Sequence, residues 1–228
     1  MLYSVETAKA NIRNRDGKRV FYLGQGDTLS PSARDWLQQE RIAILPASQA
    51  KPDAYLLENG ASFSEKPEYF THLRGNILVP KQHPIIAFRG AMDTLQAQLL
   101  LAQAAVPTKL QPSVGELLAL ARNLIAWEVM QEPVKLEKLC GLTEGELRQR
   151  SHRPQDFYGV PHFMPEATDG GAMLQLNLAR TAARSAELAA ARAFLTENGI
   201  CTRPDLMQAL NRMSSMLYIL MIQIKQER

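Results

Sequence analysis

From residue 84 onward, the chain shows the three- and four-residue apolar spacing of amphipathic helices. Met92, Leu95, Leu99 and Ala102 follow this spacing between residues 85 and 106, a stretch with one glycine and no interior proline. The spacing predicts an uninterrupted helix that buries one face.

Two patterns of the capping-box type predict further helix starts. Ser113 with Glu116 precedes a helix that runs to about residue 131, and Thr143 with Glu146 precedes a shorter one. In each pair the hydroxyl and the carboxylate can satisfy backbone N–H groups that a helix start leaves without partners.

The two strongest helical patterns come last. One spans residues 172–198 and is closed by Gly199; the other starts at Thr202, has Pro204 in its first turn and runs to the C-terminus. The first carries a seam of mostly small residues at alternating three- and four-residue spacing: Leu176, Ala179, Ala183, Ala186, Ala190 and Ala193. Because small side chains let helices approach closely, we predict a bundle of four or five helices.

The first sixty residues follow a β-α-β pattern instead. Residues 19–24 and 41–45 are predicted strands, and Ser30 followed by Pro31 starts a helix that runs to Glu40. The glycines of this region complete neither a dinucleotide signature nor a phosphate loop. We therefore interpret this piece as a docking or assembly element.

The predicted fold class is mainly α, with a small N-terminal α/β appendage. Proline, glycine and serine are frequent in residues 46–70, which predicts a loop. We divide the chain into the appendage (1–60), a linker and nucleotide-loop segment (61–79) and a helical-bundle domain (80–228).

Composition narrows the classes of partner. The 228 residues are 46% hydrophobic and 21% charged, as in ordinary globular proteins, and 26 basic against 23 acidic side chains give a net charge of +3. That charge is too small to indicate a nucleic-acid partner. No targeting signal or membrane-spanning run is visible, and two cysteines cannot build a disulfide framework. We expect a cytoplasmic protein.

Charged residues gather on one face of the 172–198 helix. Arg180, Arg184 and Glu187 stand at i, i+4 and i+7, beside the seam of small residues. One interpretation is a solvated face with an internal ion pair. The other is a polyphosphate site, because two guanidinium groups one turn apart offer forked donors to phosphate oxygens.

The final helix carries a polar stripe within an otherwise apolar sequence. Asn211, Ser215 and Tyr218 share one face, and Arg212 lies beside Asn211. Buried polar groups require partners, so the stripe either meets a polar ligand or pairs with the arginine face.

Metal-binding motifs are missing from the sequence. None of the four histidines has the Glu-x-x-His spacing of di-iron bundles, and no Cys-x-x-Cys occurs. We therefore predict no protein-held metal; Mg²⁺ arriving with a nucleotide is the ion to consider. Taken alone, Lys81 is a surface lysine and Asp93 an ion-pair partner.

In combination, three segments resemble the ATP:cob(I)alamin (corrinoid) adenosyltransferases, and within them the ethanolamine-utilization branch. The first runs from Pro80-Lys81 through Phe88-Arg89-Gly90 to Asp93-Thr94-Leu95; the second is Arg180-x-x-x-Arg184-x-x-Glu187; the third is Leu210-Asn211-Arg212-Met213-Ser214-Ser215. Each motif alone is weak, but their order along a helical bundle is specific.

The resemblance implies a ferritin-like bundle that transfers the 5′-deoxyadenosyl group of ATP to the cobalt of cobalamin and releases triphosphate. It assigns catalysis to Arg180, Arg184 and Asp93, with Asp93 pairing with Arg180 across a subunit interface. It assigns ATP, with Mg²⁺, to Thr71, Lys81, Arg89, Glu187, Asn211 and Arg212. It assigns cobalamin to His162, Phe163, Ser215 and Tyr218.

The family removes the lower axial ligand of cobalt with an apolar, often aromatic, side chain. Aligned on Pro165, His162 takes that place; by residue type Phe163 does, and we favour Phe163. Ser215 stands where the family has aspartate. The cysteine-rich metal motif of some ethanolamine-branch members is not carried over, because no cysteine precedes Cys140.

The resemblance also implies partners. We expect a homo-oligomer, with a trimer favoured and a dimer as the alternative, in which the site lies between protomers. A flavin-type reductase and association with a bacterial microcompartment fit the same family.

Two other functions compete with this one. Residues 136–150 have the pattern of a helix-turn-helix, which would make the protein a DNA-binding regulator. The loss of the family aspartate at Ser215 is compatible with a corrinoid carrier that lacks turnover.

Overall fold

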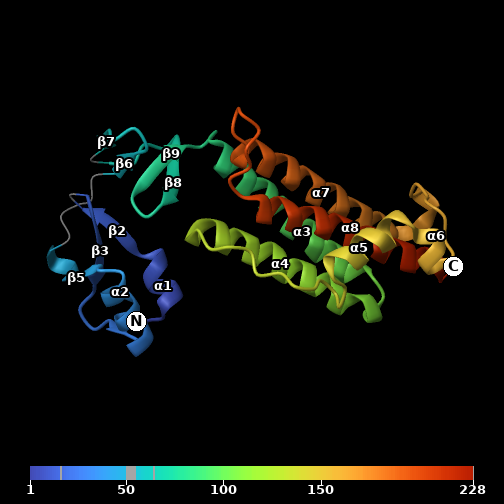
Figure 1. Ribbon diagram of the computed structural model, residues 1–228, viewed down its shortest axis with the longest axis horizontal. Coiled ribbons are helices and arrows are strands. Elements are labelled where there is room, and N and C mark those ends of the chain that lie inside the picture. Colours follow the sequence, from blue (N-terminus) through green and yellow to red (C-terminus); the bar gives the residue numbers. More distant parts are fainter. Residues whose placement is uncertain (16, 50–54, 64, 228) are drawn as a thin grey trace. The chain divides into compact units, whose positions relative to one another are not determined.

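The computed structural model describes residues 1–15, 17–49, 55–63 and 65–227 (Figure 1). Two compact units divide the chain, Met1–His83 and Pro84–Arg228. The fold is mainly α with a small α/β part, as the sequence predicts. None of the described helices is long and apolar enough to cross a membrane.

The second unit is a helical bundle. Its helices are α3 (Pro84–Ala105), α4 (Gln111–Met130), α5 (Glu144–His152), α6 (Pro154–Tyr158), α7 (Gly170–Phe194) and α8 (Pro204–Gln226), with single 3-10 turns at Thr108–Leu110 and Ala167–Asp169. Helix α3 packs against α4 and α7, and α8 packs against α7 and α4. The four long helices therefore enclose one core.

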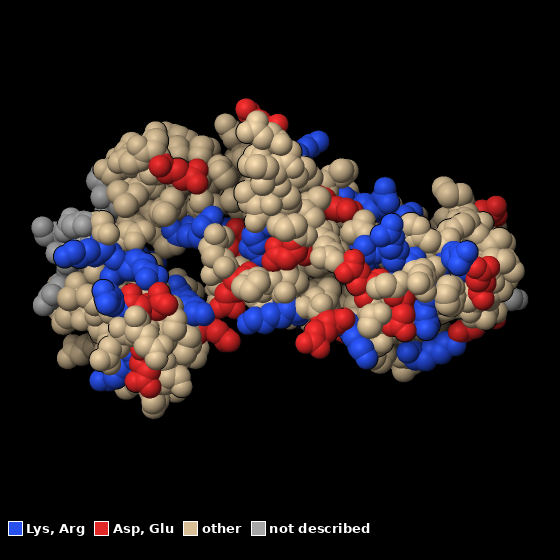
Figure 2. All heavy atoms as spheres, viewed as in Figure 1, with Lys and Arg blue, Asp and Glu red and all other residues tan. Residues whose placement is uncertain are grey.

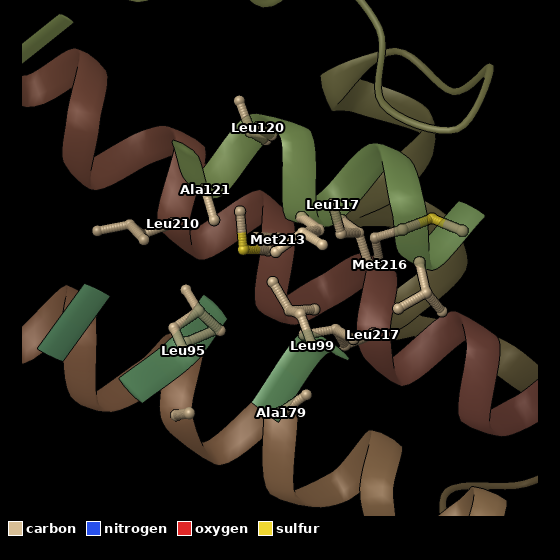
Figure 3. Packing of buried hydrophobic residues seen from close by; sticks show 14 of the residues in the cluster. Leu95, Leu99, Leu117, Leu120, Ala121, Ala179, Leu210, Met213, Met216 and Leu217 are labelled. Atoms are coloured by element: carbon tan, nitrogen blue, oxygen red, sulfur yellow. The ribbon is translucent and has the colours of Figure 1, made fainter. Parts of the chain in front are cut away.

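Each long helix contributes its apolar face to that core (Figure 3). Leu99 of α3, Leu117 of α4, Ala179 of α7 and Met213 and Leu217 of α8 lie close together and are fully buried. On α7, the predicted seam from Leu176 to Ala190 has no exposed surface. Small side chains there bring the α7 backbone close to its neighbours, which fixes the outward polar face of the helix.

The predicted start of α4 and the predicted end of α7 differ in the structure. Helix α4 begins at Gln111, so Ser113 is not its cap; the Glu116 carboxylate instead accepts a hydrogen bond from the backbone N of Cys140, at 2.7 Å. The Glu116 carboxylate therefore makes a tertiary contact and does not form a capping box. The capping box of Thr143 with Glu146 is confirmed.

Helix α7 ends at Phe194, not near residue 198. Leu195 is extended and forms a β-bridge with Cys201, and Gly199 turns the chain at φ +75°. A hairpin-like link between α7 and α8 therefore replaces the last predicted turn, because its backbone groups pair with each other across the link.

The helix-turn-helix prediction is wrong. Helix α5 is present, but residues 131–143 contain no helix, only an isolated bridge between Leu139 and Leu142. The required first helix is therefore missing. On the face of the bundle seen in Figure 2, basic and acidic side chains are interspersed, whereas a nucleic-acid site gathers basic ones.

The predicted β-α-β pattern is confirmed in the first unit. Strand β3 (Lys18–Leu23) pairs in parallel with β5 (Ala43–Pro46), and α2 (Pro31–Gln39) connects them, capped by the Ser30 hydroxyl. Antiparallel β2 (Ile12–Arg15) completes this sheet. The remaining elements are α1 (Val5–Ala10), a 3-10 turn (Ala47–Gln49) and the short parallel pair β1 (Leu2–Tyr3) and β4 (Thr28–Leu29).

A second sheet occupies part of the predicted loop. Its order is β7 (Ser62–Phe63), β6 (Tyr55–Leu57), β9 (Ile77–Pro80) and β8 (Phe70–Arg74). The loop prediction for 46–70 is therefore wrong at β6, β7 and the start of β8; residues 50–54 and 64 lie outside the described part. These strands are too short for apolar alternation to show, and partners distant in sequence stabilise them.

Candidate active site

The arginine face of α7 consists of Arg180, Arg184 and Glu187. It combines a half-buried guanidinium with an exposed one. Arg180 Nε and Nη2 both donate to Asn177 Oδ1, at 3.3 and 3.0 Å, whereas Arg184 is exposed. Burial lowers the pKa of Arg180 below its ordinary value, the charge of Arg184 lowers it further, and Tyr218 partly offsets both. Two like charges held together in this way favour an anion between them.

Helix α8 meets this face through Asn211. Its Nδ2 donates to Glu187 Oε1 at 3.1 Å, so the polar stripe of α8 pairs with the arginine face at this point. The hydroxyl of Ser215 donates to the backbone carbonyl of Asn211 at 3.1 Å. Glu187 is thus oriented by a neighbouring helix, one turn from Arg184 on its own helix.

Tyr218 contacts His162 and Phe163, the two residues that are predicted to act below the corrin. Its hydroxyl is 2.9 Å from His162 Nδ1, and the two rings are nearly parallel, with an interplanar angle of 11° and centroids 5.8 Å apart. The Phe163 ring centroid is 5.9 Å from that of Tyr218. Tyr218 is also close enough to Arg180 to affect the pKa of that guanidinium.

A partly buried ion pair also contacts Phe163. Lys225 Nζ lies 5.5 Å from the centroid of the Phe163 ring and 2.7 Å from Asp169 Oδ1, a carboxylate with 4% exposure. Sequence reasoning missed Asp169 and Lys225, because only the fold brings the start of α7 beside the end of α8. Asn177 was also missed, although its i−3 spacing from Arg180 gave a signal.

Two predicted ATP contacts form ion pairs within the protein. Arg89 Nε is 2.8 Å from an oxygen of Glu128, a fully buried carboxylate on α4. Arg212 Nη2 is 3.2 Å from Glu144 of α5 and lines a cavity of about 220 Å³ beside residues 134–142. Asn211 and Arg212 therefore have different partners: Asn211 pairs with Glu187 of the arginine face, whereas Arg212 pairs with Glu144.

The other predicted residues lie elsewhere. Thr71 is on β8 and Lys81 follows β9 in the first unit, where Lys81 Nζ is 3.0 Å from Glu68. Asp93 is exposed on α3, and no ion pair joins it or Arg184 to another described residue. Among the residues that the structure describes, no three His, Cys, Asp or Glu side chains gather in a possible metal site.

Comparison with known families gives the class of protein. The sequence profile described as cobalamin adenosyltransferase matches residues 63–224, which include α3, the arginine face and all of the third motif. The chain belongs to this family, as the three motifs predict.

Individual members of the family are similar to this chain over most of its length. The chain is 30% identical over 237 residues to the corrinoid adenosyltransferase EutT of Salmonella typhimurium strain LT2, covering 94% of this chain and 88% of the relative. It is 29% identical, with the same coverage, to the corrinoid adenosyltransferase EutT of Escherichia coli K12.

Proposed function

We propose that the protein transfers the 5′-deoxyadenosyl group of ATP to the cobalt of reduced cobalamin, giving adenosylcobalamin and triphosphate, in ethanolamine utilization. Family membership and the names of the relatives support this assignment. The observation that carries it is the arginine face of α7, with half-buried Arg180 and exposed Arg184 one turn apart.

The reaction is a displacement at the ribose 5′ carbon. The Co(I) electron pair forms the cobalt–carbon bond while the carbon–oxygen bond breaks, and the oxygen leaves with its electrons as part of triphosphate. Negative charge therefore grows on the leaving group, where Arg180 and Arg184 stabilise it. When Mg²⁺ accompanies the nucleotide, it supplies further positive charge to the phosphates.

The contact between α7 and α8 positions the nucleotide. The hydrogen bond between Asn211 and Glu187 fixes both side chains before the nucleotide binds. A fixed carboxylate and amide can orient the nucleoside so that the 5′ carbon faces the cobalt and the triphosphate faces the arginines.

Phe163 is the group that displaces the lower ligand of cobalt. It packs partly buried against the bundle core and lies close to Tyr218 and Lys225. An apolar ring below the corrin gives cobalt no electron pair, so the higher oxidation state loses stabilisation and Co(I) becomes easier to reach.

The active enzyme is a homo-oligomer, with a trimer favoured over a dimer. Leu174, Leu178 and Leu188 are 40%, 46% and 66% exposed along α7, and Leu100 and Leu101 are similarly exposed on the adjacent α3. Large exposed apolar side chains on neighbouring helices favour a protein–protein interface. In it, exposed Asp93 of one protomer pairs with Arg180 of the next.

An adenosylation assay tests the function. Purified protein with ATP, Mg²⁺ and chemically reduced cobalamin should form adenosylcobalamin, followed by its absorption spectrum, and one triphosphate per product. Binding of ATP and cobalamin without product would favour the carrier without turnover. Phe163→Ala should harm turnover from Co(II) more than turnover from Co(I), and equal losses would assign the displacement to His162.

A further inference from the structure

Both ring nitrogens of His162 are occupied by hydrogen bonds. Nε2 lies 3.2 Å from the carbonyl oxygen of His152, and Nδ1 lies 2.9 Å from the Tyr218 hydroxyl. A carbonyl oxygen only accepts, so Nε2 carries the proton. In the neutral ring Nδ1 is then the acceptor, and the Tyr218 hydroxyl donates to it.

The lone pair on Nδ1 has a chemical consequence for cobalt. A neutral imidazole nitrogen is a common metal ligand, and His162 is an exposed side chain next to Phe163. If His162 bound cobalt from below, it would replace the lower ligand that Phe163 removes. Such a donor stabilises the higher oxidation state of cobalt and so opposes the formation of Co(I).

We propose that the Tyr218 hydroxyl is a positioning group that keeps His162 from becoming a lower ligand of cobalt and leaves Phe163 as the group below the corrin. The proposal rests on the proposed function. The hydroxyl occupies the one nitrogen lone pair that His162 has available, and the Tyr218 ring contacts both His162 and Phe163. One residue thus holds the two neighbours in different roles.

Tyr218→Phe is the sharpest test, because it keeps the ring and removes only the hydroxyl. In protein without substrates, ¹⁵N NMR should show His162 with its proton on Nε2 and Nδ1 hydrogen-bonded, and the variant should lose the Nδ1 bond. Tyr3→Phe, the same change on a partly buried tyrosine of the first unit, is the matched control and should leave the His162 signals unchanged.

Electron paramagnetic resonance shows directly whether a histidine nitrogen coordinates cobalt. The sample is Co(II) cobalamin bound, together with ATP, to protein labelled with ¹⁵N-histidine. The wild type should show no protein nitrogen on cobalt, whereas Tyr218→Phe should show ¹⁵N coupling. Adding His162→Leu to the variant should remove that coupling. Coupling in the wild type, or its absence in Tyr218→Phe, would overturn the proposal.

Turnover gives a second readout. Tyr218→Phe should lose at least about tenfold more activity from Co(II) than from pre-reduced Co(I), the size of effect typical of removing an outer-shell partner. The double variant with His162→Leu should recover most of that difference; no recovery would contradict the proposal. If the wild type forms no adenosylcobalamin, the proposed function fails by itself, and the coordination of bound Co(II) still decides the role of Tyr218.

Discussion

Burial distinguishes Arg180 from Arg184 on the arginine face of α7. Asn177 holds the half-buried Arg180 in one orientation, whereas Arg184 reaches into solvent and can close on a ligand. In the proposed reaction, both charges stabilise the leaving triphosphate. Their proximity costs the empty protein some repulsion, which a bound polyphosphate relieves.

Arg184→Ala should therefore lower turnover by at least ~100-fold, as the loss of one charge-stabilising donor does in other enzymes. The measurement is the rate of adenosylcobalamin formation at saturating ATP. Arg192→Ala, which changes another exposed arginine on α7, is the control and should stay near the wild-type rate. A near-wild-type rate for Arg184→Ala would reject its role in leaving-group stabilisation.

Among the elements, α3 and α4 are joined by a buried charge pair. Arg89→Met would leave fully buried Glu128 without its guanidinium partner, and should lower the free energy of unfolding by about 3–5 kcal/mol. Chemical denaturation followed by circular dichroism measures this. The double variant Arg89→Met/Glu128→Leu should regain most of the stability, because no charge remains buried; if it does not, the loss has another cause.

Asp205 joins α8 to the chain that follows α4. Burial raises the pKa of its carboxyl, but hydrogen bonds from Arg203 and from the backbone N of Val134 outweigh burial and hold the pKa below 3.8, its ordinary value. A lowered pKa in the folded state means that the carboxylate stabilises the fold above the unfolded-state pKa. That contribution is lost as the pH falls through the folded-state pKa.

Asp205→Asn should thus destabilise the protein by about 1–3 kcal/mol at pH 7, with the difference from wild type shrinking below pH 3.8. Thermal unfolding of both proteins across this pH range tests it. A difference that stays constant with pH would show that the carboxylate charge plays no part. Asp156→Asn, on an exposed ion pair, should change little.

For the whole molecule, the proposed oligomer predicts that assembly and activity are lost together when the exposed leucines of α7 are changed. Leu178→Glu should dissociate the oligomer and abolish adenosylation together, because the proposed site needs Asp93 from another protomer. Sedimentation velocity measures the assembly. Ile200→Glu, at a side chain that is 65% exposed between α7 and α8, should change neither; a fully active Leu178→Glu monomer would contradict a site between protomers.

The sequence alone determined what local physics controls. Apolar spacing defined the long helices, Ser30 and the Thr143–Glu146 pair defined the starts of the shorter helices α2 and α5, and the three motifs indicated the family. These features depend on neighbours within one or two turns, so the amino-acid sequence alone is sufficient to predict them.

Only the tertiary structure decided which partner each polar side chain takes. Arg89 and Arg212, predicted to bind ATP, pair with carboxylates of α4 and α5, and the short strands of the second sheet exist through distant pairing. The hydrogen bond between Tyr218 and His162 joins residues 56 positions apart. Spacing along the chain cannot predict such partners, because a buried polar group takes the partner that packing brings within reach.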